Sequence, residues 1–159
     1  SGHGLLSNGE TYGVLMRGGT VAGRLVDISG SVTSDANFLR IGVLLMDGFN
    51  TPNIPHASLI ATERLSLNGE VSSASFHVFG ARPIGVEVQG HTLLQVGLPG
   101  GSPTAQLAIQ GRVQDQEPPS LGSLRYAVGL HDNAQLVALG GAAVDISSVV
   151  YIASLFGAL

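Results

Sequence analysis

Residues 59–79 read LIATERLSLNGEVSSASFHVF, two runs of alternating apolar and polar side chains on either side of Asn68-Gly69. Apolar residues at every second position are typical of a β-strand with one buried face and one solvated face. An Asn-Gly pair favours a two-residue turn, because both central residues of that turn need positive φ. The stretch therefore predicts a β-hairpin with strands at 59–67 and 70–79.

The same pattern continues outward along the chain. Gly18-Gly19 and the polar triplet His131-Asp132-Asn133 are further turn signals, and each predicts another hairpin. The strands of these hairpins are expected at 11–17, 20–28, 124–130 and 134–139. Four more strands are expected at 38–46, 84–89, 104–113 and 144–155. The last run is apolar on both faces, which predicts a central strand of a sandwich or a strand that faces partner subunits.

These segments predict an all-β fold. Roughly ten short strands without a convincing helix are typical of an antiparallel β-sandwich or jelly roll. No internal repeat of fixed period is evident. A chain of 159 residues fits one domain. We expect that domain at 11–159, after a linker or an expression scar at residues 1–10.

Composition excludes several classes of function. The chain has no cysteine, which excludes disulfides, thiolate metal sites and a cysteine nucleophile. Its net charge is −4 and its seven arginines are scattered, so we expect no nucleic-acid partner. The longest apolar stretch, at 146–159, is too short to cross a bilayer, and no membrane insertion is expected. Charged residues make up only 11% of the chain, which favours a surface partly hidden between subunits.

No motif predicts chemistry. The five histidines never lie two or four residues apart, so no strand-borne or helix-borne metal pair is present, and a metal site would need distant residues to converge. The sequence contains neither Gly-x-Ser-x-Gly nor a phosphate-binding loop. We therefore expect no enzyme activity, no catalytic residue, no metal and no cofactor.

A ligand site is expected in polar loops with stiff backbones. The loops in question are 50–56, 114–120 and 131–133, the last with nearby Arg125. Pro52, Pro55, Pro118 and Pro119 restrict the first two loops. The candidate ligand-binding residues are Asn50, Asn53, His56, Gln114, Asp115, Arg125, His131, Asp132 and Asn133.

The close of the chain, VDISSVVYIAS at 144–154, is similar to the last strand of trimeric β-sandwich heads. These heads include adenovirus-type fibre knobs, phage tail-needle and fibre tips, and tumour-necrosis-factor-like heads. The resemblance implies a homotrimer on the virion surface that binds a host-cell receptor or glycan without covalent chemistry. It places the ligand on outer loops or in grooves between subunits.

Three other functions stay open. A secreted or cell-surface module of the tumour-necrosis-factor-like or lectin type would stack a sugar ring on Tyr12, Tyr126 or Tyr151, because the chain has no tryptophan. A capsid decoration protein would be purely structural. An enzyme would instead need a convergent cluster of histidine, aspartate and serine in a concave site.

Overall fold

The structure, a computed structural model, describes residues 9–33, 39–47, 56–72, 82–115 and 126–152. These residues form ten β-strands: β1 (Glu10–Arg17), β2 (Thr20–Thr33), β3 (Leu39–Met46), β4 (Ser58–Ser72), β5 (Arg82–Val88), β6 (Leu93–Val96), β7 (Gln106–Asp115), β8 (Tyr126–Leu130), β9 (Gln135–Ala138) and β10 (Ala143–Ile152). The all-β prediction is confirmed for this part of the chain. None of it forms a helix long and apolar enough to cross a membrane.

All the strand pairings are parallel. Sheet A has the order β1-β3-β5-β8, and a second sheet has the order β10-β7-β4-β6-β9 with β2 also paired to β4. The predicted antiparallel β-sandwich or jelly roll is therefore wrong. Strands that follow each other in the chain do not pair, and each strand instead pairs with its counterpart in the next turn of the chain.

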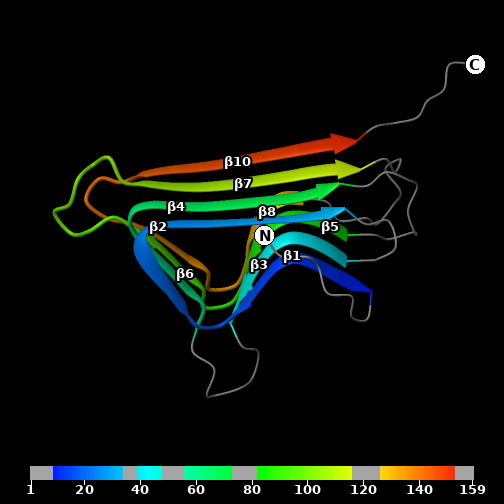
Figure 1. The fold of residues 1–159 in the computed structure, drawn as a ribbon, viewed down its shortest axis with the longest axis horizontal. Helices are drawn as coiled ribbons and strands as arrows, with labels where there is room; N and C mark the ends of the chain where they lie inside the picture. The colour runs from blue at the N-terminus through cyan, green and yellow to red at the C-terminus, as the bar shows by residue number, and fades with distance from the viewer. Residues whose placement is uncertain (1–8, 34–38, 48–55, 73–81, 116–125, 153–159) are drawn as a thin grey trace, which may run out of the picture.

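The chain winds as a parallel coil with three faces (Figure 1). Each turn adds one strand to sheet A and then continues into the second sheet, which bends into two faces. The short face contains residues 20–23 of β2, residues 58–61 of β4, β6 and β9. The long face contains residues 25–33 of β2, residues 64–72 of β4, β7 and β10. Sheet A strands begin at residues 10, 39, 82 and 126, so the turns differ in length and leave no fixed period in the sequence.

Apolar side chains from all three faces meet inside the coil. Val43 of sheet A, Leu67 of the long face and Leu94 of the short face belong to one cluster and are fully buried. The cluster is built from cross-turn ladders, in which the same position on successive strands holds an apolar residue. One such ladder is Val14, Val43, Val86 and Val128. Period-2 alternation therefore places the apolar residues of each ladder on the inner side of its strands. In β3 and β5 of sheet A the other side is buried as well.

The turn signals at Gly18-Gly19 and His131-Asp132-Asn133 form corners of the coil, and the hairpins predicted there are wrong. Gly18 and Gly19 have φ of 72° and 88°, and Asp132 has φ of 59°. β1 and β2 lie in different sheets, as do β8 and β9. Positive φ is what both a hairpin and a corner require. The residue types therefore indicate a positive φ, but they do not indicate the strand with which the next segment pairs.

The hairpin predicted at Asn68-Gly69 is also wrong, for a different reason. β4 runs without a break through this pair from Ser58 to Ser72, and Gly69 is not among the glycines with positive φ. A Cβ atom at Gly69 would overlap the carbonyl oxygen of Gly85 in sheet A. The glycine is needed because the two sheets approach each other backbone to backbone at this point.

β10 is an edge strand, which corrects the prediction of a central one. It pairs with β7 on one side, and no other described strand pairs with it. Val144, Ile146 and Val150 are therefore exposed, although they continue the inward-facing ladders of β7. The strands predicted at 38–46, 84–89 and 104–113 are confirmed as β3, β5 and β7 with small changes of boundary.

Candidate functional site

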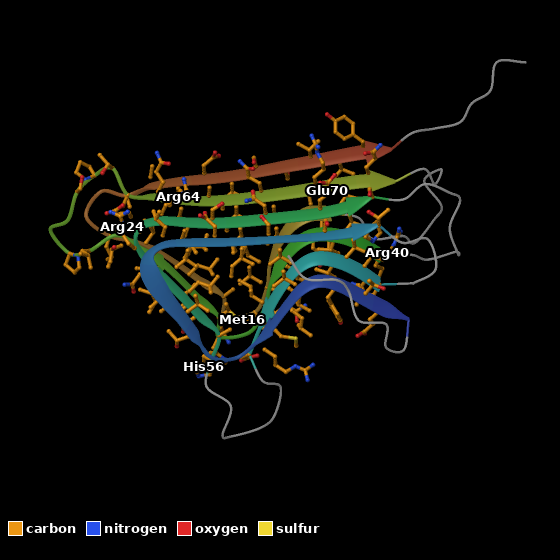
Figure 2. The ribbon with its side chains drawn as sticks, viewed as in Figure 1. Met16, Arg24, Arg40, His56, Arg64 and Glu70 are labelled. Atoms are coloured by element: carbon orange, nitrogen blue, oxygen red, sulfur yellow. The ribbon has the colours of Figure 1, made fainter. Side chains whose placement is uncertain are left out.

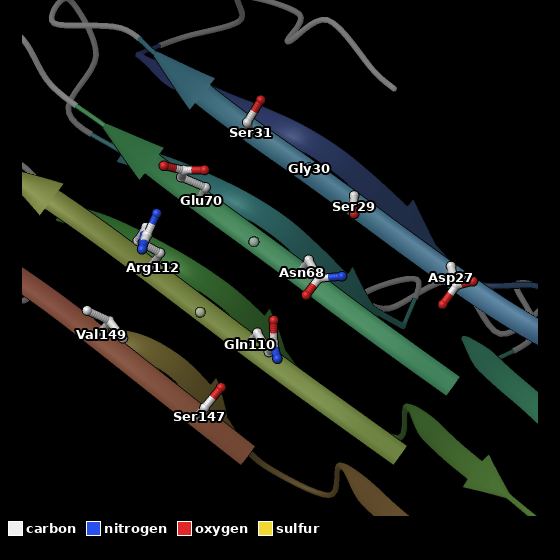
Figure 3. Close-up of a pocket in the computed structure, with 12 residues that line it drawn as sticks. Asp27, Ser29, Gly30, Ser31, Asn68, Glu70, Gln110, Arg112, Ser147 and Val149 are labelled. Carbon is white, nitrogen blue, oxygen red and sulfur yellow. The ribbon is translucent and has the colours of Figure 1, made fainter. Parts of the chain in front are cut away.

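A polar trough crosses the long face of the coil and has a volume of about 730 Å³ (Figure 3). Its floor is a row of glycines from three neighbouring strands, Gly30, Gly69 and Gly111. These glycines are fixed by packing on the other side of the sheet. Cβ atoms there would overlap the carbonyl oxygens of Gly42, Gly85 and Ala127, respectively. The floor of the trough is therefore bare backbone because the close packing of the two sheets requires glycine at these positions.

Two rows of outward side chains form the walls of the trough. One row is Ser29, Asn68, Gln110 and Ser147, and the other is Ser31, Glu70, Arg112 and Val149. Neighbouring members of a row are register partners on adjacent strands, so they lie about 4.8 Å apart along the coil. Figure 3 shows these side chains projecting from four neighbouring strands. The trough thus offers hydroxyl and amide groups at a regular spacing.

The charges of the trough are few and of both signs. Glu70 and Arg112 are register partners in one wall. Asp27 at the end of the trough lies 2.9 Å from the Arg64 guanidinium, and the hydrogen bond and charge of Asp27 raise the pKa of Arg64. Figure 2 shows Arg64 and Glu70 on the outer side of the long face. Among the residues that the structure describes, Arg112 is the one cation that lines the trough, so the trough offers little positive charge to neutralise a row of phosphates.

An exposed tyrosine lies beside the trough. Tyr151 of β10 is 55% exposed and is the register partner of Gln114 in β7. The other two tyrosines are engaged in sheet A: Tyr12 donates to Glu10 at 2.6 Å, and Tyr126 donates to Glu87 at 2.8 Å. Burial, followed by the hydrogen bond to Glu10, raises the pKa of Tyr12 to about 12. Of the three tyrosines named from the sequence, Tyr151 is the one whose ring is open to a ligand.

The residues predicted from the sequence fall in three places. Asn50, Asn53 and Arg125 lie outside the described residues. Gln114 and Asp115 end strand β7, where a loop was expected, and the exposed Gln114 lies one position beyond the trough wall. His56, His131, Asp132 and Asn133 lie at the corner that joins sheet A to the short face. The structure therefore brings part of the predicted set together, but away from Gln114.

The corner holds a compact polar cluster of Asp47, His56, His91 and Asn133. Asp47 Oδ2 accepts a hydrogen bond from the His91 backbone N–H at 3.2 Å and lies 3.1 Å from His91 Nδ1. His56 Nδ1 lies 3.8 Å from the same oxygen. Asn133 Nδ2 lies 3.1 Å from His91 Nε2. The two hydrogen bonds from His91, backbone first, lower the pKa of Asp47 below its ordinary value of 3.8.

A second group lies on the other side of the same turn. His131 Nε2 lies 3.2 Å from the Tyr126 hydroxyl, which donates to the buried Glu87. Burial is the main reason that the pKa of Tyr126 is raised, and the hydrogen bond to Glu87 adds to it. His131 and Asn133 of this turn thus contact two different polar groups, the Tyr126 hydroxyl and the His91 ring. His131 and Asn133 were named together as ligand-binding candidates, yet His131 contacts Tyr126 and Asn133 contacts His91.

The Tyr126 hydroxyl is expected to make the fold less stable at alkaline pH. A raised pKa means that the folded state holds the phenol proton more tightly than the unfolded state does. The stabilisation is complete below the ordinary tyrosine pKa of 10.0 and is lost as the pH rises above that value. Tyr126→Phe should therefore flatten the fall in the free energy of unfolding above pH 10.0. Urea unfolding of both proteins across this range tests it, and parallel slopes would contradict it.

Several residues of both sites gave no signal in the sequence. Asp47 and His91 are 44 positions apart and meet because successive corners of the coil stack on each other. Gln110 reads as an ordinary solvated position of an alternating strand, and Asn68 was predicted to lie in a hairpin turn. Only the register between strands shows that they are neighbours.

Comparison with protein-family models, curated proteins and solved structures finds no match to this chain.

Proposed function

We propose that this protein is a non-enzymatic attachment module that holds an extended, hydroxyl-rich ligand, such as a glycan, in the trough of its long face. The trough is the observation that carries the proposal. Its amide and hydroxyl groups both donate and accept hydrogen bonds, as sugar hydroxyls do, and its carboxylates accept them. A place on a virion surface or outside a cell agrees with this role, and the virion is the setting we propose.

The geometry favours a polymer over a small compact ligand. The walls repeat once per strand along the coil axis, so one chain of sugar units can bond to several strands in succession. The exposed ring of Tyr151 supplies an apolar platform beside Gln114, and sugar rings stack on such surfaces. The mixed charges of Glu70 and Arg112 favour a neutral ligand over a sulfated or phosphorylated one.

Binding is tested with a panel of soluble neutral polysaccharides (glucans, mannans and galactans) and with heparin as the polyanion. Asn68→Ala and Gln110→Ala should each weaken binding of the retained polysaccharide roughly fivefold, since each removes one or two hydrogen bonds. Affinity electrophoresis or calorimetry measures the change. Retention of heparin alone would overturn the choice of a neutral ligand.

The chain offers a matched control for these variants. Gln106 lies on the same strand and the same face as Gln110, and it is exposed but does not line the trough. Gln106→Ala should leave the affinity unchanged. Equal losses in the Gln106 and Gln110 variants would show that the trough is not the site, and no binding to any member of the panel would overturn the proposal.

We also propose that the chain associates with copies of itself through β10, as the trimer expected from the sequence. β10 is an edge strand whose one charged residue is Asp145. Its exposed Val144, Ile146 and Val150 continue the interior ladders of β7, on the opposite side of the sheet from Tyr151. Light scattering should give a mass three times that of the 16.2 kDa chain, and the Ile146→Lys variant should have the mass of a single chain. A monomeric parent protein would overturn the association, and a dimer would correct its stoichiometry.

A further inference from the structure

Three potential metal ligands converge at the corner between sheet A and the short face. Asp47 follows β3, His56 lies just before β4 and His91 just before β6. One donor atom of each residue lies within 4.8 Å of the other two. Two imidazoles and one carboxylate are the ligand types that bind Zn²⁺ and its neighbours in the first transition row. Figure 2 places His56 at this corner, away from the long face.

The spacing of the donor atoms suits a small divalent ion. Ligands at about 2.0–2.1 Å from a tetrahedral ion lie about 3.3 Å from one another. Asp47 Oδ2 lies 3.1 Å from His91 Nδ1 and 3.8 Å from His56 Nδ1, on either side of that value. The two imidazole rings are tilted by 46° with centroids 5.0 Å apart, so they are not stacked face to face. Small rotations of exposed side chains would complete the geometry.

The carboxylate is held in place by backbone. Asp47 is the least exposed of the three, at 19% of its side chain, and its Oδ2 accepts the backbone N–H of His91. A Cβ atom at Gly90 would overlap this carboxylate, and Gly90 has φ of 66°. The glycine therefore leaves the space that Asp47 occupies. Asp47 is thus a fixed ligand around which the two exposed histidines can adjust.

Asn133 is placed to select the tautomer of His91. Metal binding at Nδ1 requires the proton on Nε2, and Nε2 lies 3.1 Å from the Asn133 side-chain amide. Rotation of that amide by half a turn presents its oxygen to the Nε2 proton. Metal-bound histidines usually donate their other N–H to such an acceptor. Asn133 would act as a positioning residue.

We propose that Asp47, His56 and His91 bind one divalent transition-metal ion of the zinc class, with Asn133 orienting His91. Three protein ligands leave the remaining coordination position to solvent or to a ligand of the ion. The side chains of His56 and His91 are 64% and 57% exposed, so an ion reaches the site directly from solvent. This inference is independent of the proposed function, because the trough and the corner share no residue.

Zn²⁺ and Co²⁺ titrations of the whole chain, free of any affinity tag, test the site. Calorimetry should show one equivalent of Zn²⁺ bound, and Co²⁺ should give the intense visible bands of a four- or five-coordinate ion. His56→Ala and His91→Ala should each weaken binding by more than tenfold, since loss of an outer partner alone costs about 10–100-fold. Asn133→Ala should weaken it by about tenfold, and Asn133→Asp should restore it.

His131→Ala is the matched control. It removes an exposed histidine of the same corner that is outside the cluster, and it should leave the Zn²⁺ affinity unchanged. His56→Ala guards against a folding artefact, because the side chain is exposed and the contacts described for it are the 3.8 Å approach to Asp47 and the tilted ring contact with His91. Absence of saturable Zn²⁺ binding would overturn the proposal. So would binding that survives both His56→Ala and His91→Ala in variants with the parent circular-dichroism spectrum.

Discussion

Gly69→Ala is expected to lower the free energy of unfolding by about 3 kcal/mol. Gly69 lies in the second half of β4, where the long face and sheet A approach backbone to backbone. The new Cβ atom would overlap the carbonyl oxygen of Gly85. Backbone cannot rotate away as a side chain can, so the two sheets must separate and the packing beside them must loosen.

Thermal or urea unfolding measures this loss. For a chain of this length, about 3 kcal/mol corresponds to a fall in Tm of roughly 6–12 °C. The matched control is Gly23→Ala in β2, where the nearest atom to a new Cβ is the Leu25 carbonyl oxygen at 3.5 Å. Gly23 is exposed and lacks positive φ, so Gly23→Ala should leave the free energy of unfolding unchanged or raise it slightly. Equal effects of the two substitutions would contradict the close approach of the sheets.

Leu45→Ala is expected to cost about 2–5 kcal/mol of unfolding free energy. Leu45 of β3 is 0% exposed and packs in the main cluster inside the coil. Its register partners on either side are Met16 and Val88. Truncation leaves a cavity between turns of the coil, and the packed neighbours, the buried Val88 and the partly buried Met16, limit the collapse that would refill it.

The same ladder provides the control for Leu45. Leu130 is the register partner of Val88 on the last strand of sheet A, and it is 40% exposed. Leu130→Ala should cost less than about 1 kcal/mol, because much of its side chain already contacts water. Urea unfolding of the two variants makes the comparison. A loss at Leu130 as large as that at Leu45 would mean that this end of the coil is covered in solution.

Strand positions were predictable because alternation is a local property. Ile84, Val86 and Val88 alternate with smaller or polar residues, and a strand is found there. Pairing direction was not predictable, since one wet and one buried face give the same alternation in an antiparallel sandwich and in a parallel coil. In β4 the alternation of Leu65, Leu67 and Val71 continues in phase across Gly69, which is compatible with a single strand.

The binding residues were less predictable than the strands. His56 and Asn133 were named from loop composition, and both lie in the corner cluster, but Asp47 and His91 complete it from other turns of the chain. The trough walls are ordinary polar positions when read along one strand. Their proposed function depends on the register between strands. That register cannot be predicted from a single sequence that has no fixed repeat.

The sequence by itself determined which segments extend, that the backbone turns with positive φ at Gly18-Gly19 and at Asp132, and which chemistries its residue types exclude. Those properties depend on neighbours along the chain, such as the Gly18-Gly19 corner. Only the tertiary structure decided that the strands pair in parallel between turns, that Gly69 serves close packing, and that Asp47 meets His91. These features depend on contacts between segments far apart in the chain, whose registers are fixed when the interior of the coil is filled.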